Sequence, residues 1–379
     1  APAANCAPSR ACCLTGQWSP RHGVYTVNNS DRGKSKTRKL IPTKNTLHIN
    51  NDNLTIAGAL KPAGYTTCHI GKWHVTKDPT KNGFDINIGG NQHGGPYAGG
   101  YHSPFKYPNC EQKEKGEYLT DRLTQEAIGF INKNKAKPFF LHLAYYTVHT
   151  PIQAKKEKVA RFKKKSSTKA HSNPTYAAMI SSLDDNIGKL MANLKENGLL
   201  ENTLIIFTSD NGGLPDDKDW NLPGYDPNGI LRGTKGEIYQ GGRAVPFIAM
   251  WGDGNNGGHD TITPGSISNQ MICAHDWVAS FYALTRTSMS DRDAMDSVNL
   301  LPVFFQKHPE LTPLRDALHF QSQPARDHPY GIRVGDYTLH LDDQNVSGEF
   351  FDLSVDPSQT NNLISDPAQA QRVTDMRTL

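Results

Sequence analysis

Two uninterrupted apolar segments constrain the fold of this chain more than any other feature of its sequence. They cover residues 139–146 and 204–208, and each is typical of a parallel strand that is buried on both faces. A helix is predicted between them over residues 176–197, where apolar residues recur at helical spacing and Gly198 follows. Buried strands that alternate with helices predict an α/β fold through about residue 310, with a mostly parallel sheet covered by helices.

The sequence changes in character after this point. Residues 330–341 predict two short strands around a Gly-Asp turn, and a segment with two adjacent phenylalanines follows at residues 349–353. We therefore expect a small antiparallel sheet with a C-terminal helix. The predicted division is a large domain over residues 1–310 and a small β-sheet subdomain with a terminal helix over residues 311–379.

Polar and glycine-rich segments follow the predicted strands of the large domain. The first apolar run leads into His149 and Pro151, and the second leads into Asp210, Asn211 and two glycines. Sheets of this kind bind their ligands beyond the carboxyl ends of the strands. These segments are therefore candidates for a functional site, although a turn is the commoner role of an Asp-Asn-Gly-Gly sequence.

A further predicted strand, residues 65–70, ends at Gly71 and presents Lys72 and His74. On an extended segment these two side chains point the same way, because side-chain direction repeats every second residue. Two such groups aimed at one point suit an anionic substrate. The alternative is a surface lysine and a hydrogen-bonded histidine around a buried Trp73.

The N-terminus carries a third kind of signal. Cys6-Ala7-Pro8-Ser9-Arg10, followed by Leu14-Thr15-Gly16, resembles the signature of the type I sulfatases of the alkaline phosphatase superfamily. In that family the cysteine is oxidised to formylglycine, an aldehyde whose hydrate is the nucleophile. The alternative is that Cys6, Cys12 and Cys13 are structural thiols or disulfide partners beside an ordinary turn.

Other segments match the same family in the expected order. Residues 64–74 resemble its second signature, His149 and Pro151 its His-x-Pro loop, and Asp210-Asn211 its cation-binding pair. Residues 231–246 resemble the segment with a second active-site lysine, here Lys235. This chain has Gln240 where the family usually has a Glu, which puts a charge role there in doubt. The resemblance, bacterial polysaccharide sulfatase-like or arylsulfatase-like, implies an alkaline-phosphatase-like core.

The resemblance also implies a reaction, the release of sulfate from a sulfated carbohydrate or an aryl sulfate. Formylglycine at residue 6 would attack sulfur beside a divalent cation. The implied roles are these: Arg10 orients the nucleophile, Lys72 and Lys235 neutralise the sulfate oxygens, His149 or Lys235 protonates the leaving oxygen, and His74 takes a proton from the hydrate.

The implied cation is Ca²⁺, with Mg²⁺ as the alternative, bound by Asp210, Asn211 and residue 6. Family members carry a further pair of aspartates on a strand before the nucleophile, whereas this chain begins five residues before Cys6. We therefore expect the first segment, with that pair, to be absent from this chain. Asp184 and Asp185 do not replace the pair, because they lie within the predicted helix and are expected on its polar side.

Two stretches bear on the substrate. Residues 89–108 are rich in glycine and aromatic residues and resemble a loop of bacterial polysaccharide sulfatases. His93 and His102 in this loop, with Arg232, are candidate substrate contacts, and an irregular insertion is the alternative. The lysine-rich run over residues 155–165 would either attract a polyanion or form a solvated helix face.

Composition limits the partners. The net charge of +4 gives no general case for nucleic-acid binding. No apolar run is long enough to span a membrane, and we expect a periplasmic or secreted protein. Export would permit one or two disulfides among the remaining cysteines. The resemblance implies one protein partner, a formylglycine-generating or equivalent maturation enzyme.

Three other functions stay open at this point. A phosphodiesterase or phosphonate monoester hydrolase of the same superfamily can use the same aldehyde. A truncated, inactive sulfatase would only bind sulfated glycan. A metal-free cysteine hydrolase is the least favoured, because no recognised signature pairs Cys6 with a histidine and an orienting Asn or Asp.

Overall fold

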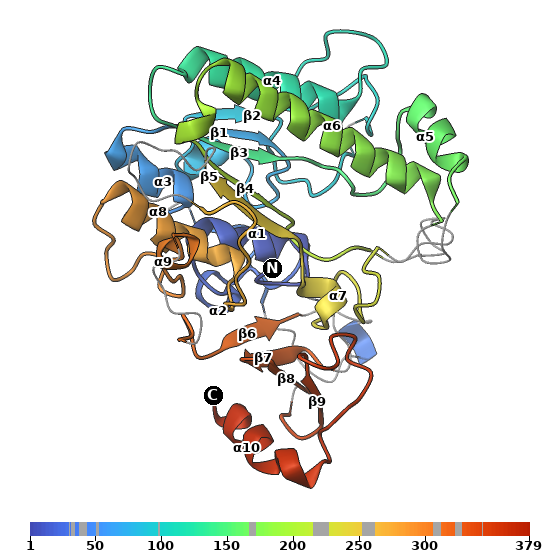
Figure 1. The fold of residues 1–379 in the computed structure, drawn as a ribbon, viewed down its shortest axis with the longest axis vertical. Helices are drawn as coiled ribbons and strands as arrows, with labels where there is room; N and C mark the ends of the chain where they lie inside the picture. The colour runs from blue at the N-terminus through green and yellow to red at the C-terminus, as the bar shows by residue number, and fades with distance from the viewer. Residues whose placement is uncertain are drawn as a thin grey trace.

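The structure is a computed structural model that describes residues 1–29, 31, 35–37, 44–50, 53–97, 99–166, 172–214, 227–251, 262–305, 312–322, 328–342 and 344–379. A large α/β part lies at one end of the long axis, and a smaller sheet with the C-terminal helix lies at the other (Figure 1). Within the described ranges, no helix has both the length and the apolar character that crossing a membrane requires.

The sheet next to the candidate site is parallel. Strand β1 (Thr66–Gly71) lies between β2 (Ile86–Ile88) and β3 (Phe139–Ala144), and both neighbours run parallel to it. Helices α4 (Leu119–Asn134) and α6 (Pro174–Glu196) run side by side over one face. The parallel strand predicted within residues 139–146 is confirmed, and its residues are half-buried rather than buried because β3 lies at the edge of this sheet.

The strand predicted at residues 204–208 is present, but its predicted environment is wrong. Strand β4 (Leu204–Thr208) pairs antiparallel with β5 (Phe247–Trp251) in a separate two-stranded sheet. Phe207 is 37% exposed and Ile248 is 61% exposed. An apolar run indicates a strand with apolar contacts but carries no information on direction, which depends on the partner strand.

Several helices pack around these strands. Helix α1 (Cys6–Thr15) packs under the face of the parallel sheet opposite α4 and α6, where its apolar residues share a core with Trp73 and Phe84. The other helices are α2 (Ser19–His22), α3 (Ile56–Leu60), α5 (Lys156–Lys163), α7 (Gln240–Arg243), α8 (Trp277–Thr285) and α9 (Leu301–Phe304). Short 3-10 turns cover Ser35–Thr37, Lys61–Ala63, Pro79–Asn82, Leu200–Asn202, Ala274–Asp276 and Pro367–Gln369.

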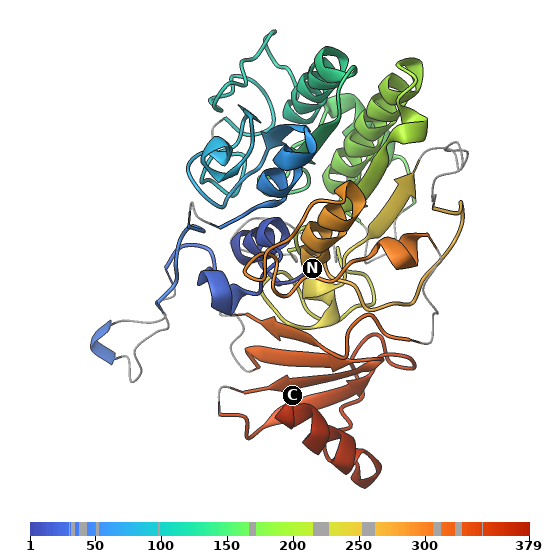
Figure 2. The ribbon, with the colours of Figure 1, turned by 90° about the vertical axis from the view of Figure 1, so that its left-hand side faces the viewer.

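The C-terminal part forms a four-stranded antiparallel sheet. Its strands are β6 (Leu318–Gln321), β7 (Tyr330–Val334), β8 (Tyr337–Leu341) and β9 (Gly348–Asp352), in that spatial order. Helix α10 (Ala370–Thr378) packs beside the sheet (Figure 2), with two of its side chains in the core beneath Phe350. The predicted small sheet and terminal helix are confirmed, and β6 is an additional strand. The domain boundary near residue 310 stays a prediction.

Candidate active site

Cys6 is the first residue of α1 and lies inside the protein, with 3% of its surface exposed. Asn5 caps the helix, because its Oδ1 accepts a hydrogen bond from the Cys6 backbone N–H at 2.9 Å. Nine of the ten helix residues are buried, and Gly16 ends the helix with φ of 69°. A group at residue 6 is therefore held rigidly at the positive end of a helix, which favours a negative charge there.

Lys72 and His74 reach the same place from the end of β1. Gly71 turns the chain with φ of 95°, and a Cβ on it would lie 2.2 Å from the carbonyl oxygen of Ala144. His74 also has a positive φ, 63°, so this segment is not extended as the sequence suggested. The two side chains still face Cys6, and the backbone turn rather than strand alternation brings them there.

Asp210 follows β4 and is surrounded by positive charge. Its Oδ2 lies 3.1 Å from Lys72 Nζ and 3.3 Å from Arg10 Nη1. Arg10 also donates from Nε to the carbonyl oxygen of Trp73 at 2.7 Å and from Nη2 to the carbonyl oxygen of Lys72. Arg10 therefore joins the helix of Cys6 to the turn of Lys72 and to the end of β4.

His149 and Lys235 complete the arrangement. The Nζ of Lys235 lies 3.5 Å from Nε2 of His149, and Nδ1 of His149 lies 2.7 Å from the carbonyl oxygen of Thr150. The His149 loop is held from outside by the Tyr101 hydroxyl, which donates to the His149 carbonyl oxygen at 2.9 Å. The Lys235 loop is fixed to the segment after β4, because its backbone N–H donates to the Gly213 carbonyl oxygen at 3.0 Å.

The positive groups change the ionisation of Cys6. Burial by itself would raise the pKa of the thiol, but Lys72, Lys235 and a hydrogen bond with His74 outweigh it and lower that pKa to about 5. Burial also opposes ionisation of Asp210, yet Lys72, Arg10 and Lys235 hold the pKa of its carboxyl far below the usual range. The site is therefore built to stabilise negative charge at residue 6.

The surroundings of the site lower the pKa of His74 and His149 but raise the pKa of Lys235. Burial lowers the pKa of His74, and burial together with Lys72 and Lys235 lowers the pKa of His149 to about 3. For Lys235 burial is outweighed by the negative charge of Cys6 and Asp210, so the pKa of its ammonium group is raised. At neutral pH the two imidazoles are neutral and Lys235 carries a proton.

The residues at the end of β4 fit an oxygen-binding cation. The Oδ1 of Asn211, the residue that follows Asp210, is buried without a hydrogen-bond partner. Carbonyl and carboxylate oxygens are the donors that Ca²⁺ and Mg²⁺ take. Among the described residues there is no cluster of three or more His, Cys, Asp or Glu side chains that could hold a metal. Asp184 and Asp185 are exposed on α6, and Asp185 pairs with Lys158 at 2.6 Å, as the sequence suggested.

The candidate substrate residues lie outside this group. Arg232 stacks on the Tyr239 ring at 4.0 Å and pairs with Glu349 of β9 at 3.1 Å, so its guanidinium faces the C-terminal sheet. His93 is exposed, and His102 packs against the ring of Tyr118. Substrate roles for His93, His102 and Arg232 stay predictions.

Sequence reasoning missed two contributors and one absence. Asn5 was not singled out, although an Asn before the first helical residue is a common helix cap. Tyr97 lies in the aromatic-rich loop over residues 89–108, and its ring meets that of His149 edge-on at 6.0 Å. All six cysteines are free, so the disulfides that export would permit are not formed.

A sequence model of the Sulfatase family matches residues 1–287. This chain belongs to the sulfatase family. The matched region contains every segment that meets around Cys6. Sulfatases are sulfuric ester hydrolases that generally use a formylglycine and a divalent cation.

Individual sulfatases agree with this assignment. The chain is 28% identical over 431 residues to the uncharacterized sulfatase YdeN of Escherichia coli (strain K12), covering 98% of this chain and 70% of that protein. It is 31% identical over 328 residues to the N-acetylgalactosamine-6-sulfatase of Homo sapiens, covering 79% of this chain and 57% of that protein. The chain thus spans between about half and three quarters of the length of these relatives.

A solved structure supports the fold over the whole chain. The crystal structure of Ps i-CgsB in complex with k-i-k-neocarrahexaose has a TM-score of 0.73 and 27% sequence identity to this chain. The matched region covers 99% of this chain and 81% of the solved chain. The predicted alkaline-phosphatase-like fold of a sulfatase is therefore confirmed.

Proposed function

We propose that this sulfatase releases sulfate from a sulfated carbohydrate or an aryl sulfate, with residue 6 as the reaction centre. The observation that carries the proposal is the convergence of Lys72, Lys235 and His74 on a buried Cys6, whose pKa they lower to about 5. A sulfate ester is an anion with a poor leaving group. Its hydrolysis needs positive charge at the sulfate oxygens, a held nucleophile and a proton donor.

Conversion of Cys6 to formylglycine would supply an aldehyde whose hydrate is the nucleophile. The chain's own residues then position and neutralise the substrate. Lys72 and Lys235 are the ammonium groups whose charge lowers the pKa of Cys6, so they are assigned to the sulfate oxygens. Arg10 holds the Lys72 turn through the carbonyl oxygens of Lys72 and Trp73, and therefore orients residue 6 against that turn.

The contacts of His149 favour one of the two candidate proton donors. Its Nδ1 lies 2.7 Å from a carbonyl oxygen, which can only accept, so Nδ1 carries the proton of the neutral ring. The Nε2 of His149 is then an acceptor for Lys235 Nζ at 3.5 Å. We therefore assign the proton for the leaving oxygen to Lys235, with His149 as the group that orients it. His74, neutral at pH 7, accepts a proton at residue 6.

The divalent cation of this site is proposed to be Ca²⁺, with Mg²⁺ as the alternative, held by Asp210, Asn211 and residue 6. The unpaired Oδ1 of Asn211 supports this assignment. When bound, the cation would add positive charge beside the sulfate oxygens. Dialysis against a chelator should lower turnover, and separate additions of Ca²⁺ and Mg²⁺ should identify the ion by recovery of the rate.

We also propose a substrate class and a location for this protein. The resemblance to a sulfatase solved with a neocarrahexaose and to an N-acetylgalactosamine-6-sulfatase supports a sulfated glycan substrate. We propose a periplasmic or secreted location, and conversion of Cys6 by a formylglycine-generating or equivalent maturation enzyme. Fractionation of the source cells would test the location.

The decisive experiment is mass spectrometry of the peptide that ends at Arg10, followed by assays of the same sample. We expect an aldehyde at residue 6 and hydrolysis of an aryl sulfate well above that of the matched aryl phosphodiester. A Cys6→Ala variant should have no activity. Preferred cleavage of the phosphodiester would assign the chain to phosphodiesterases instead. A converted protein that binds sulfated glycan without releasing sulfate would contradict the proposed hydrolysis.

A further inference from the structure

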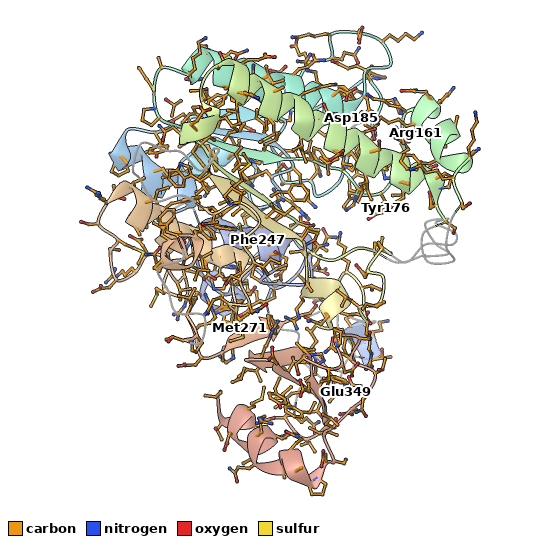
Figure 3. The ribbon with its side chains drawn as sticks, in the orientation of Figure 1. Arg161, Tyr176, Asp185, Phe247, Met271 and Glu349 are labelled. Carbon is orange, nitrogen blue, oxygen red and sulfur yellow. The ribbon has the colours of Figure 1, made fainter. Side chains whose placement is uncertain are left out.

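A depression of about 450 Å³ lies beside α5, away from Cys6. It is lined by His102, Gln153, Ala154, Lys156, Val159, Ala160, Lys163 and Thr175. These side chains combine cationic groups, hydrogen-bonding groups and a small apolar face. Figure 3 shows α5, marked by Arg161, next to the segment of α6 that carries Tyr176 and Asp185.

The lysines of α5 divide into two sets. Lys155 pairs with Asp121 at 2.5 Å and Lys158 pairs with Asp185 at 2.6 Å, which fixes α5 against α4 and α6. Lys156 and Lys163 line the depression and pair with no carboxylate in the part of the chain that the structure describes. The lysine run is therefore more than a uniformly solvated face, since two of its charges stay unneutralised at a concave surface.

The depression and the proposed proton-donor site belong to one unit of structure. Gln153 lines the depression four residues after His149, so the two Cα atoms are at most ~15 Å apart. The Oε1 of Gln153 accepts from the Tyr101 backbone N–H at 3.0 Å, and the Tyr101 hydroxyl donates to the His149 carbonyl oxygen. Gln153 and Tyr101 therefore join the depression to the His149 loop.

We propose that this depression binds a second anionic group of a polymeric sulfated glycan while its reacting sulfate lies at Cys6. Lys156 and Lys163 would neutralise that group, Gln153 and Thr175 offer hydrogen bonds to sugar hydroxyls, and the small apolar face suits the C–H edge of a sugar ring. The inference rests on the proposed function, and it makes the enzyme selective for oligomers over small sulfate esters.

The test compares two double variants on two substrates. In Lys156→Ala with Lys163→Ala, KM for a sulfated galactan hexasaccharide should rise about three- to tenfold, as the loss of two exposed charge contacts predicts. The kcat/KM for an aryl sulfate should stay within about twofold, because that substrate does not reach the depression. The difference in KM for the hexasaccharide between the wild-type protein and this variant should shrink at high salt. Arg in place of both Lys156 and Lys163 should restore the low KM.

Lys164→Ala with Lys165→Ala is the matched control. It removes the same charge from the end of the same helix, at positions that do not line the depression. An equal rise in KM for both double variants would overturn the proposal in favour of general attraction, and an unchanged KM in the first would overturn it outright.

The proposal and the proposed function fail in different ways. Absence of sulfate release from both the hexasaccharide and the aryl sulfate by the converted wild-type protein would refute the proposed function alone. In that case calorimetric titration with the same hexasaccharide still decides on the depression. Weaker binding only in the Lys156 and Lys163 variant would support it, and equal binding by all variants would refute it.

Discussion

Replacing Asp210 by Asn should destabilise this sulfatase strongly, because one carboxylate balances several buried cations. Lys72 is 4% exposed and Arg10 is 8% exposed, and both contact the same oxygen of Asp210. Asn keeps the shape of the side chain but removes the charge. Breaking a buried ion pair from one side costs about 3–5 kcal/mol.

This loss converts into a measurable shift of the unfolding temperature. Unfolding entropies near 2.1 cal/mol/K per residue give roughly 0.8 kcal/mol/K for a chain of 379 residues. Asp210→Asn should therefore unfold about 4–6 °C below the wild-type protein, measured by scanning calorimetry at pH 7 with a chelator present. The chelator separates the loss of the ion pairs from any loss of metal binding.

The stabilisation that ionised Asp210 provides depends on pH. The cations around Asp210 hold its pKa below the unfolded value of about 3.9. The stabilisation is thus fully present above pH 4 and is lost as the pH falls from there toward the folded pKa. The difference in unfolding temperature between the wild-type protein and Asp210→Asn should be constant from pH 5 to 8 and should narrow below pH 4.

Asp185→Asn is the control, because the Asp185 side chain is 52% exposed, so that solvent screens its pair with Lys158 and the pair should be worth less than about 1 kcal/mol. An Asp210→Asn protein that unfolds within 1 °C of wild type, or no lower than the control, would refute the reasoning.

Three other predictions concern single residues. Gly71→Ala should lower the free energy of unfolding by about 2–5 kcal/mol in urea titrations, because the turn has φ of 95° and the new Cβ would lie 2.2 Å from a carbonyl oxygen of β3; a loss below about 1 kcal/mol would contradict this. Gln359→Ala should lower kcat for an aryl sulfate with little change in KM, because Gln359 Oε1 accepts from the Gln240 backbone at 2.7 Å and so holds the segment that carries Lys235. Gln359→Glu keeps that acceptor and should retain the rate, whereas equal losses in both variants would exclude the role. Unconverted Cys6 should react with iodoacetamide at a rate that rises with a midpoint at a pH of about 5, as followed by peptide mass spectrometry. A midpoint near 9 would contradict the lowered pKa.

Sequence patterns were sufficient to predict that the segments after β1 and β3 meet at the site. Lys72 and His149 follow β1 and β3, two parallel neighbours, so their carboxyl ends lie at one edge of the sheet. The first turn of α1 could be placed there only through the resemblance, since no periodicity connects Cys6 to the strands. Local sequence patterns thus predicted the helices and strands, and the order of the family motifs predicted that Cys6 lies close to the residues that follow the strands.

The remaining features depend on contacts between residues far apart in the chain. The direction of β4 is set by β5, whose residues begin 39 positions after the end of β4 (247 minus 208). The substrate role of Arg232 stays a prediction, and the pairing of its guanidinium with Glu349, 117 residues away, could not be read from the sequence. Such partners leave no trace in local composition, and so sequence patterns could not reveal them.

The burial of α1 limits when Cys6 can be modified during folding. The Cys6 side chain is nearly inaccessible once nine of the ten residues of its helix are packed. A small substrate can enter such a site, but another enzyme cannot close its own active site around this residue. The proposed oxidation of Cys6 by a maturation enzyme would therefore have to precede the packing of α1, and the fraction of active molecules would then be set by a kinetic competition between that oxidation and folding.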